Sequence, residues 1–137
     1  MDSHRTPPRL RVVLVEDSPL LGQLLRDMLA EIEGVDVVAV AAGESAALRA
    51  LQEQPSDLVI VDLQLTDGSG VAVLRTLRLE PECYGRPVAV VLSNNGDPRL
   101  RSCCRALGVE RFFDMALQMD ELIDFVGETR RSIAGGQ

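Results

Sequence analysis

Four side chains that follow apolar runs have the clearest capacity for chemistry in this sequence. They are Glu16, Asp17, Asp62 and Ser93. Carboxylate oxygens are the hard ligands that Mg²⁺ prefers, and carboxylates that lie close together raise one another's pKa unless a cation separates them. A hydroxyl can donate a hydrogen bond to an anionic group attached to a neighbouring carboxylate. These residue types predict a magnesium site at Glu16, Asp17 and Asp62, with Ser93 beside it.

The elements that must position these side chains follow from the hydrophobic pattern. Continuous apolar runs, typical of strands buried on both faces, alternate with stretches of helical periodicity. The expected strands are Val12–Val15, Val35–Val40, Leu58–Leu63, Val88–Leu92 and Arg111–Asp114. The expected helices are Leu20–Ile32 (capped by Ser18 and ended by Gly34), Glu44–Gln54, Gly70–Leu79, Asp97–Leu107 and Asp120–Ile133. The alternation predicts a flavodoxin-like doubly wound α/β fold, with a five-stranded parallel sheet in the order 2-1-3-4-5.

This strand order brings the acidic side chains to one place. In an open α/β sheet, ligands bind beyond the carboxyl ends of the strands where the strand order reverses, here between the first and third strands. Glu16 and Asp17 end the first strand and Asp62 ends the third, so we expect the three carboxylates to converge. Taken singly, each acid could instead be a helix cap or a solvated loop residue.

Length and charge limit the classes of function. The chain has 137 residues, of which 46% are hydrophobic, and this suits one domain with a single core. A formal net charge of −7 argues against nucleic acid or an anionic membrane as a partner. No apolar run approaches the roughly 18 residues of a membrane span. We expect a flexible tail over residues 1–9, one domain over residues 10–134 and no effector domain.

Cysteine usage and the N-terminus indicate the compartment. Three cysteines, two of them adjacent, offer neither a disulfide framework nor zinc-ligand spacing. The N-terminal residues contain no apolar stretch of the kind a signal peptide needs. Both observations predict a cytoplasmic protein. All 14 basic residues are arginine, and the chain contains no lysine.

Over nearly its whole length the chain resembles the receiver domain of two-component response regulators. Four segments carry the resemblance in the family's order: the acidic pair in Val13–Ser18, the phospho-acceptor segment Asp57–Gly70, the fourth strand with its switch hydroxyl in Val88–Ser93, and the run into the fifth strand in Gly108–Asp114. The resemblance implies the fold already expected from the pattern of elements.

The resemblance also implies a reaction. The family's phospho-acceptor corresponds to Asp62, which would take a phosphoryl group from a histidine kinase or a histidine phosphotransfer protein. Mg²⁺ would be held by Glu16, Asp17, Asp62 and the backbone carbonyl of Gln64. His4, the only histidine, lies in the expected tail, so a partner must supply the phosphohistidine.

The resemblance further implies a conformational response. Ser93 would be the switch hydroxyl, and Phe112 would be the aromatic switch that turns inward. The face formed by the helix at 97–107, the strand at 111–114 and the helix at 120–133 would change shape and bind an unidentified protein target, or form a homodimer. Such a response is a shift between two packings of one chain.

Several positions depart from the family's pattern. Met115 stands where the family has a lysine that contacts the phosphoryl group, and methionine carries no charge and donates no hydrogen bond. We expect weaker coupling to the output face as a result. Ala116 and Thr66 each replace a common proline, and Glu16 replaces a commoner aspartate. Thr66 is expected to loosen a turn without affecting the site.

Other functions remain open from the sequence. Met115 favours a pseudo-receiver, a protein-binding module that signals without phosphorylation. The segment Asp62–Thr66 is similar to the acceptor box of haloacid-dehalogenase-like phosphatases, but their second aspartate is Gln64 here. A flavin carrier shares the fold but finds no support in the loop after the first strand. We expect no turnover of a small-molecule substrate.

Overall fold

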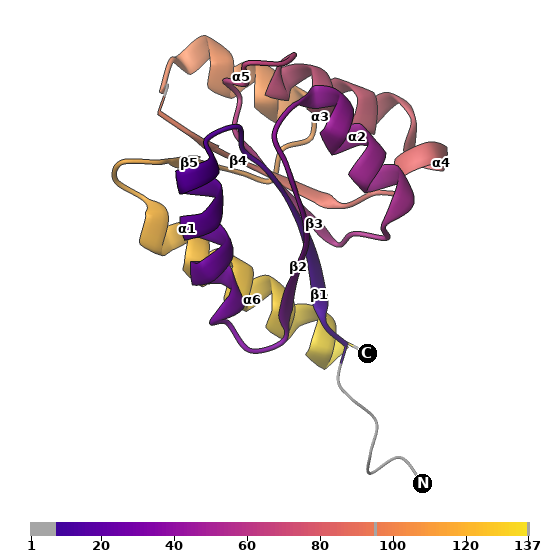
Figure 1. The fold of residues 1–137 in the computed structure, drawn as a ribbon, viewed down its shortest axis with the longest axis vertical. Coiled ribbons are helices and arrows are strands. Elements are labelled where there is room, and N and C mark those ends of the chain that lie inside the picture. Colours follow the sequence, from indigo (N-terminus) through magenta and orange to yellow (C-terminus); the bar gives the residue numbers. More distant parts are fainter. Residues whose placement is uncertain (1–7, 95, 137) are drawn as a thin grey trace, which may run out of the picture.

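A five-stranded parallel sheet in the order β2-β1-β3-β4-β5 forms the centre of the computed structural model, which describes residues 8–94 and 96–136 (Figure 1). The strands are β1 (Leu10–Val15), β2 (Val35–Ala41), β3 (Leu58–Val61), β4 (Val88–Ser93) and β5 (Arg111–Asp114). The helices are α1 (Pro19–Ala30), α2 (Glu44–Glu53), α3 (Gly70–Leu79), α4 (Pro81–Tyr84), α5 (Pro98–Ala106) and α6 (Met119–Gly136). The predicted flavodoxin-like fold and strand order are confirmed. The tail expected at residues 1–9, including His4, falls largely outside the described residues.

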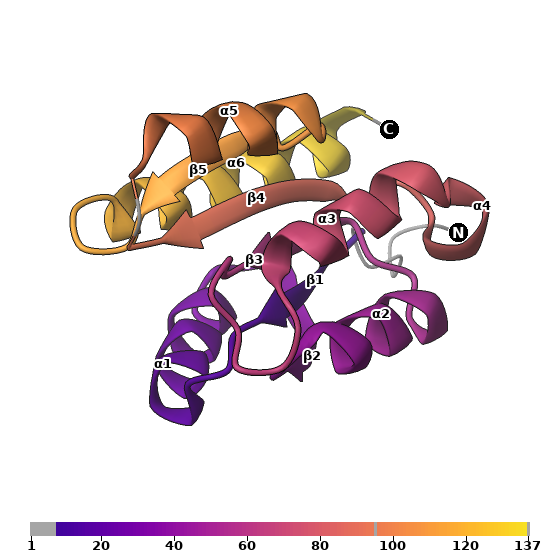
Figure 2. The ribbon, with the colours of Figure 1, turned by 90° about the horizontal axis from the view of Figure 1, so that it is seen from above.

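Helices cover both faces of the sheet (Figures 1 and 2). On one face Leu14 packs in a core with Leu25 of α1 and Leu122 of α6. On the other face Val13 packs in a second core with Val73 of α3. Neighbouring strand residues thus point to opposite cores, which explains why the strand sequences are continuously apolar. Within the described part of the chain, no helix is both long and apolar enough to cross a membrane.

Several element ends differ from the sequence prediction. Strand β3 ends at Val61 instead of Leu63, because the Asp62 carboxylate accepts a hydrogen bond from the backbone N–H of Gln64 at 3.0 Å and turns the chain. Helix α1 ends at Ala30 instead of Ile32, and Gly34 then reverses the chain with a φ of 82°. The four-residue helix α4 was not predicted, since so short a segment has no readable period.

Candidate functional site

The register of the sheet places Glu16 and Asp62 next to each other. Val15 of β1 pairs with Val61 of β3, and the N–H of Asp62 donates to the Val15 carbonyl at 3.0 Å. The residues that follow this pair are the two acids. One oxygen from each of Glu16, Asp17 and Asp62 lies within 4.8 Å of the other two. The convergence predicted from the strand order is present in the structure.

Glu16 is the buried member of this cluster, with 4% of its surface exposed. Its Oε2 accepts a hydrogen bond from the Ser18 N–H at 3.0 Å, while its Oε1 is buried without a partner. Burial, together with a smaller contribution from the neighbouring Asp62, raises the pKa of Glu16 to about 7. A buried carboxylate oxygen without a donor is costly unless a cation binds it. The unpartnered Oε1 therefore fits the role of a metal ligand.

Asp17 is held by the loop that follows β3. Its Oδ2 accepts two hydrogen bonds from Thr66, one from the backbone N–H and one from the hydroxyl, both at 2.9 Å. These bonds lower the pKa of Asp17, with the hydroxyl as the main cause. Asp17 is therefore kept ionised beside two carboxylates whose pKa values are raised.

Asp62, the third acid of the cluster, is half-buried. Burial raises its pKa, whereas the hydrogen bond from the Gln64 N–H lowers it. Gly70, the first residue of α3, lies directly behind it: a Cβ there would lie 2.4 Å from the Asp62 carbonyl oxygen. Only glycine lets the start of α3 approach this closely and so fix the backbone of Asp62.

The other residues singled out from the sequence lie on β4 and β5. Ser93 ends β4 and is buried, and its carbonyl accepts from the Met115 N–H at 2.9 Å. Met115 is half-buried and packs on the core beneath α1 and α6. Phe112 is half-buried on the opposite face, and the Arg101 guanidinium lies 4.4 Å from the centre of its ring.

The sequence of the chain matches a known family. Residues 12–126 match the profile of the response regulator receiver domain. The chain belongs to this family. The phosphate regulon transcriptional regulatory protein PhoB of Rhizobium meliloti is 34% identical over 113 residues, which make up 82% of this chain and 48% of PhoB. A protein-glutamate methylesterase/protein-glutamine glutaminase of Desulfotalea psychrophila is 30% identical over 112 residues, 82% of this chain and 30% of that protein. The chain thus spans less than half the length of these relatives.

Solved receiver structures share the fold. The response regulator domain of Thermotoga maritima CheB superposes with a TM-score of 0.76 at 16% identity and covers 93% of this chain and 97% of its own. A CheY-like receiver domain protein of Methanospirillum hungatei superposes with a TM-score of 0.77 at 16% identity, over 94% of this chain and 99% of its own. At 16% sequence identity this similarity shows a common fold. The chemistry of the site must be inferred from its own residues.

Compared with the pattern expected of a receiver domain, Thr66 has an unforeseen role. The expectation that it only loosens a turn is wrong, because it donates both hydrogen bonds to Asp17. A proline at this position has no N–H and no hydroxyl, so it could make neither bond. The spacing in the sequence gave no signal for this contact, since the loop after β3 folds back over a separation of 49 residues.

Met115 brings no positive charge to the carboxyl edge of the sheet, where the three acids lie. The groups that shift the pKa of Glu16 and Asp62 are other carboxylates, backbone N–H groups and burial, and no arginine of the described chain is among them. Within the part of the chain that the structure describes, no arginine is ion-paired or hydrogen-bonded to Glu16 or Asp62, although Arg26 of α1 lines the same hollow as Glu16 and Asp17. Arg101 instead stacks on Phe112, a contact that the sequence did not reveal.

Proposed function

We propose that this receiver domain accepts a phosphoryl group on Asp62 from a phosphohistidine of a histidine kinase or a histidine phosphotransfer protein. The observation that carries the proposal is the buried, unpartnered Oε1 of Glu16 within a three-carboxylate cluster. A structural cluster of helix caps would leave no such oxygen, because capping carboxylates are satisfied by backbone N–H groups. The cluster instead has the composition of a site for a hard divalent cation.

In the proposed reaction an Asp62 carboxylate oxygen attacks phosphorus. The new O–P bond forms as the N–P bond breaks, and the histidine nitrogen keeps the electron pair and takes a proton from solvent. Mg²⁺ would be held by Glu16, Asp17, Asp62 and the Gln64 carbonyl, and it supplies charge neutralisation during transfer. Thr66 keeps Asp17 ionised and Gly70 fixes the backbone of Asp62, so the chain supplies the positions of the acids.

The response to phosphorylation would pass through β4 and β5. The acyl phosphate adds roughly two negative charges next to the end of β4. Ser93 would reorient toward these charges, and Phe112, which is on β5 beside β4, would turn inward. The output face is then α5, β5 and α6. It fits a protein partner or a second copy, because α5 presents Arg99 and Arg105 while α6 presents Asp120 and Asp124.

The phosphodonor partner would dock on an apolar rim around the site. Leu20 at the start of α1 is 83% exposed, and Leu117 in the turn after β5 is 82% exposed. Both belong to the carboxyl edge of the sheet, where the three acids lie. Exposed leucines on the edge that carries the reacting group suit a protein surface that must be covered only during transfer.

Mass measurement after phosphorylation tests the proposal. The chain is incubated with Mg²⁺ and acetyl phosphate, and the intact protein is weighed. We expect one added phosphoryl group, no addition in Asp62→Asn, and an undiminished addition in Asp67→Asn, a control for an exposed aspartate in the same loop. Equal phosphorylation of Asp62→Asn would show that another residue is the acceptor. Repeated release of phosphate from a phosphomonoester would instead indicate a phosphatase, and we infer that this does not occur.

Met115 supports a second candidate, a pseudo-receiver that binds a protein partner without phosphorylation. The phosphorylated state would lack a charge-assisted hydrogen bond worth about 1.5–3 kcal/mol. The two functions differ in one result. Absence of any phosphoryl addition, from both acetyl phosphate and a histidine kinase, favours the pseudo-receiver, and addition at Asp62 favours the receiver.

A further inference from the structure

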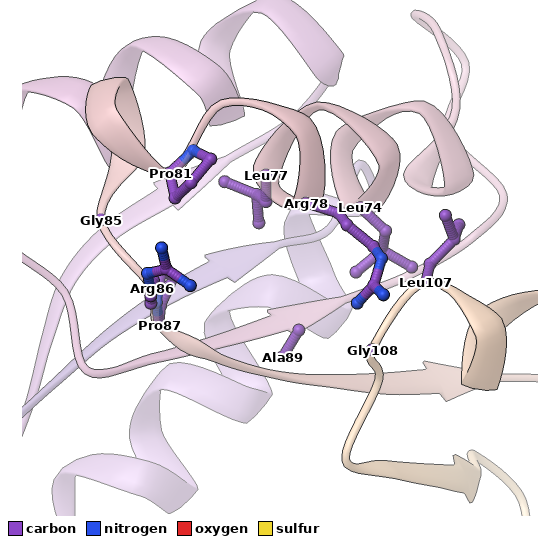
Figure 3. Close-up of a pocket in the computed structure, with 10 residues that line it drawn as sticks. All are labelled: Leu74, Leu77, Arg78, Pro81, Gly85, Arg86, Pro87, Ala89, Leu107 and Gly108. Carbon is purple, nitrogen blue, oxygen red and sulfur yellow. The ribbon is translucent and has the colours of Figure 1, made fainter.

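A hollow of about 200 Å³ lies at the amino-terminal edge of the sheet, opposite to the acidic site (Figure 3). It lies between the last turns of α3, the turn that leads into β4, and the end of α5. Six apolar side chains line it: Leu74, Leu77, Pro81, Pro87, Ala89 and Leu107. The hollow is therefore distinct from the carboxylate cluster in both place and chemistry.

Two arginines are the charged residues that line this hollow. Figure 3 shows Arg78 and Arg86 on either side of Ala89, with their guanidinium groups in the open space. No acidic residue is among the lining residues. Within the described part of the chain, neither guanidinium makes an ion pair or a hydrogen bond. Two uncompensated positive charges thus flank one apolar hollow in a protein of net charge −7.

Small residues keep the hollow open. Gly108 adopts a φ of 90° after α5, and a Cβ there would lie 3.0 Å from the Nη1 atom of Arg78. Gly108 therefore allows the Arg78 side chain to lie against the end of α5. Gly85 lines the hollow with a φ of 73°, a backbone conformation that other residues rarely adopt. Ala89 leaves space on the strand beneath Leu77, which a larger side chain would fill.

We propose that this hollow binds a small organic anion with an apolar body. The body, of one or two rings, would be buried against the leucines and prolines, which favours binding through removal of apolar surface from water. A carboxylate, sulfonate or phosphate-ester group would accept hydrogen bonds from Arg78 and Arg86, whose planar guanidinium groups match such oxygen atoms. Asp62 is not among the lining residues, so this proposal does not rest on phosphorylation of Asp62.

Naphthalene-2-sulfonate is a suitable probe because it combines two rings with one anionic group. It is titrated into the full chain, and binding is followed by amide chemical shifts in NMR spectra. We expect saturable shifts at Arg78, Gly85, Ala89 and Gly108. The double variant Arg78→Gln/Arg86→Gln should bind at least about fivefold more weakly, since exposed charge pairs contribute modestly. Arg75→Gln, which removes an exposed arginine of α3 outside the hollow, should bind with unchanged affinity.

Two further measurements separate shape from charge. Ala89→Leu should reduce binding by filling the hollow, and neutral 2-naphthol should bind at least about fivefold more weakly than the sulfonate. Asp62→Asn should bind the probe like the unmodified chain, so failure of the phosphorylation proposal would leave this result intact. Shifts that map to another surface, equal affinity in the double arginine variant, equal affinity for 2-naphthol, or no saturable binding would each overturn the proposal.

Discussion

At the scale of single residues, Thr66 lowers the pKa of Asp17, a candidate magnesium ligand. Its hydroxyl and N–H both donate to Asp17, and they lower the pKa of that carboxyl. Asp17 therefore remains ionised while the pKa values of Glu16 and Asp62 are raised by burial. The acid that accepts two hydrogen bonds has a lowered pKa, and the two acids that burial removes from water have raised pKa values.

Replacement of Thr66 by valine tests this role. Thr66→Val keeps the volume and the backbone N–H but removes the hydroxyl, so the orientation of Asp17 is less fixed. We expect about a tenfold loss of Mg²⁺ affinity, as for other groups that orient metal ligands. Isothermal titration calorimetry measures the affinity, and Thr76→Val on α3 is the matched control. An affinity equal to that of the control would mean that Thr66 only shapes the loop.

The raised pKa of Glu16 predicts a pH-dependent stability of the metal-free protein. The folded protein keeps this proton up to about pH 7, whereas the unfolded chain releases it near 4.5. The folded state binds more protons in this window, so the free energy of unfolding should fall as pH rises through it, by up to about 3 kcal/mol.

Urea unfolding in the presence of a chelator, at several pH values between 5 and 8, measures this effect. Glu16→Gln should remove this part of the decline, whereas Glu53→Gln, at an exposed position in α2, should retain it. Added Mg²⁺ should restore stability at pH 8, because it binds the ionised form. A decline of the same size in Glu16→Gln would assign it to other groups.

At the scale of elements, the stack of Arg101 on Phe112 ties α5 to β5. The guanidinium lies 4.4 Å from the ring centre, and both side chains are half-buried. Because Phe112 is the proposed aromatic switch, this contact favours the present position of the ring over the inward one. Arg101 of α5 thus packs against the edge strand β5 through Phe112.

Removal of the contact between Arg101 and Phe112 should weaken the packing of α5 against β5. Arg101→Gln is expected to lower the free energy of unfolding by about 0.5–1 kcal/mol, the range for a partly exposed cation–π contact. Arg99→Gln removes an exposed arginine of the same helix and should have a smaller effect. Chemical denaturation compares the two variants. Equal stability of both would show that the stack contributes nothing measurable.

At the scale of the whole molecule, Met115 separates the acidic site from the output face. The usual lysine would connect the phosphoryl group to β5 through a charge-assisted hydrogen bond, and methionine packs in the core instead. The site and the α5–β5–α6 face then communicate through Ser93 and Phe112 alone in the proposed response. We therefore expect phosphorylation to cause a smaller conformational change in this domain than in a receiver domain that has the usual lysine.

Restoration of the cation should strengthen the response. In Met115→Lys we expect larger phosphorylation-dependent NMR shifts across α5, β5 and α6 than in the unmodified chain, because the ammonium gains a hydrogen bond only when the phosphoryl group is present. Ala116→Lys places the same charge at an exposed neighbouring position and serves as the control. An unaltered response in Met115→Lys would count against the proposed loss of coupling.

The sequence by itself determined the order of the strands and helices, the sheet order and the convergence of Glu16, Asp17 and Asp62. These follow from local hydrophobic periods and from the handedness of parallel crossovers, which do not depend on distant detail. The departure at Met115 was also visible in the sequence, since it concerns one position in an ordered set of segments.

Only the tertiary structure decided which groups donate hydrogen bonds to each acid and which acid oxygen lacks a donor. The bonds from Thr66 to Asp17, the unpartnered oxygen of Glu16, and the arginines beside the apolar hollow depend on how loops fold across long separations. Such contacts have no period or local motif, because they arise from loop closure and side-chain packing after the elements have formed. The sequence showed which residue types are present, and the three-dimensional structure showed which groups they contact.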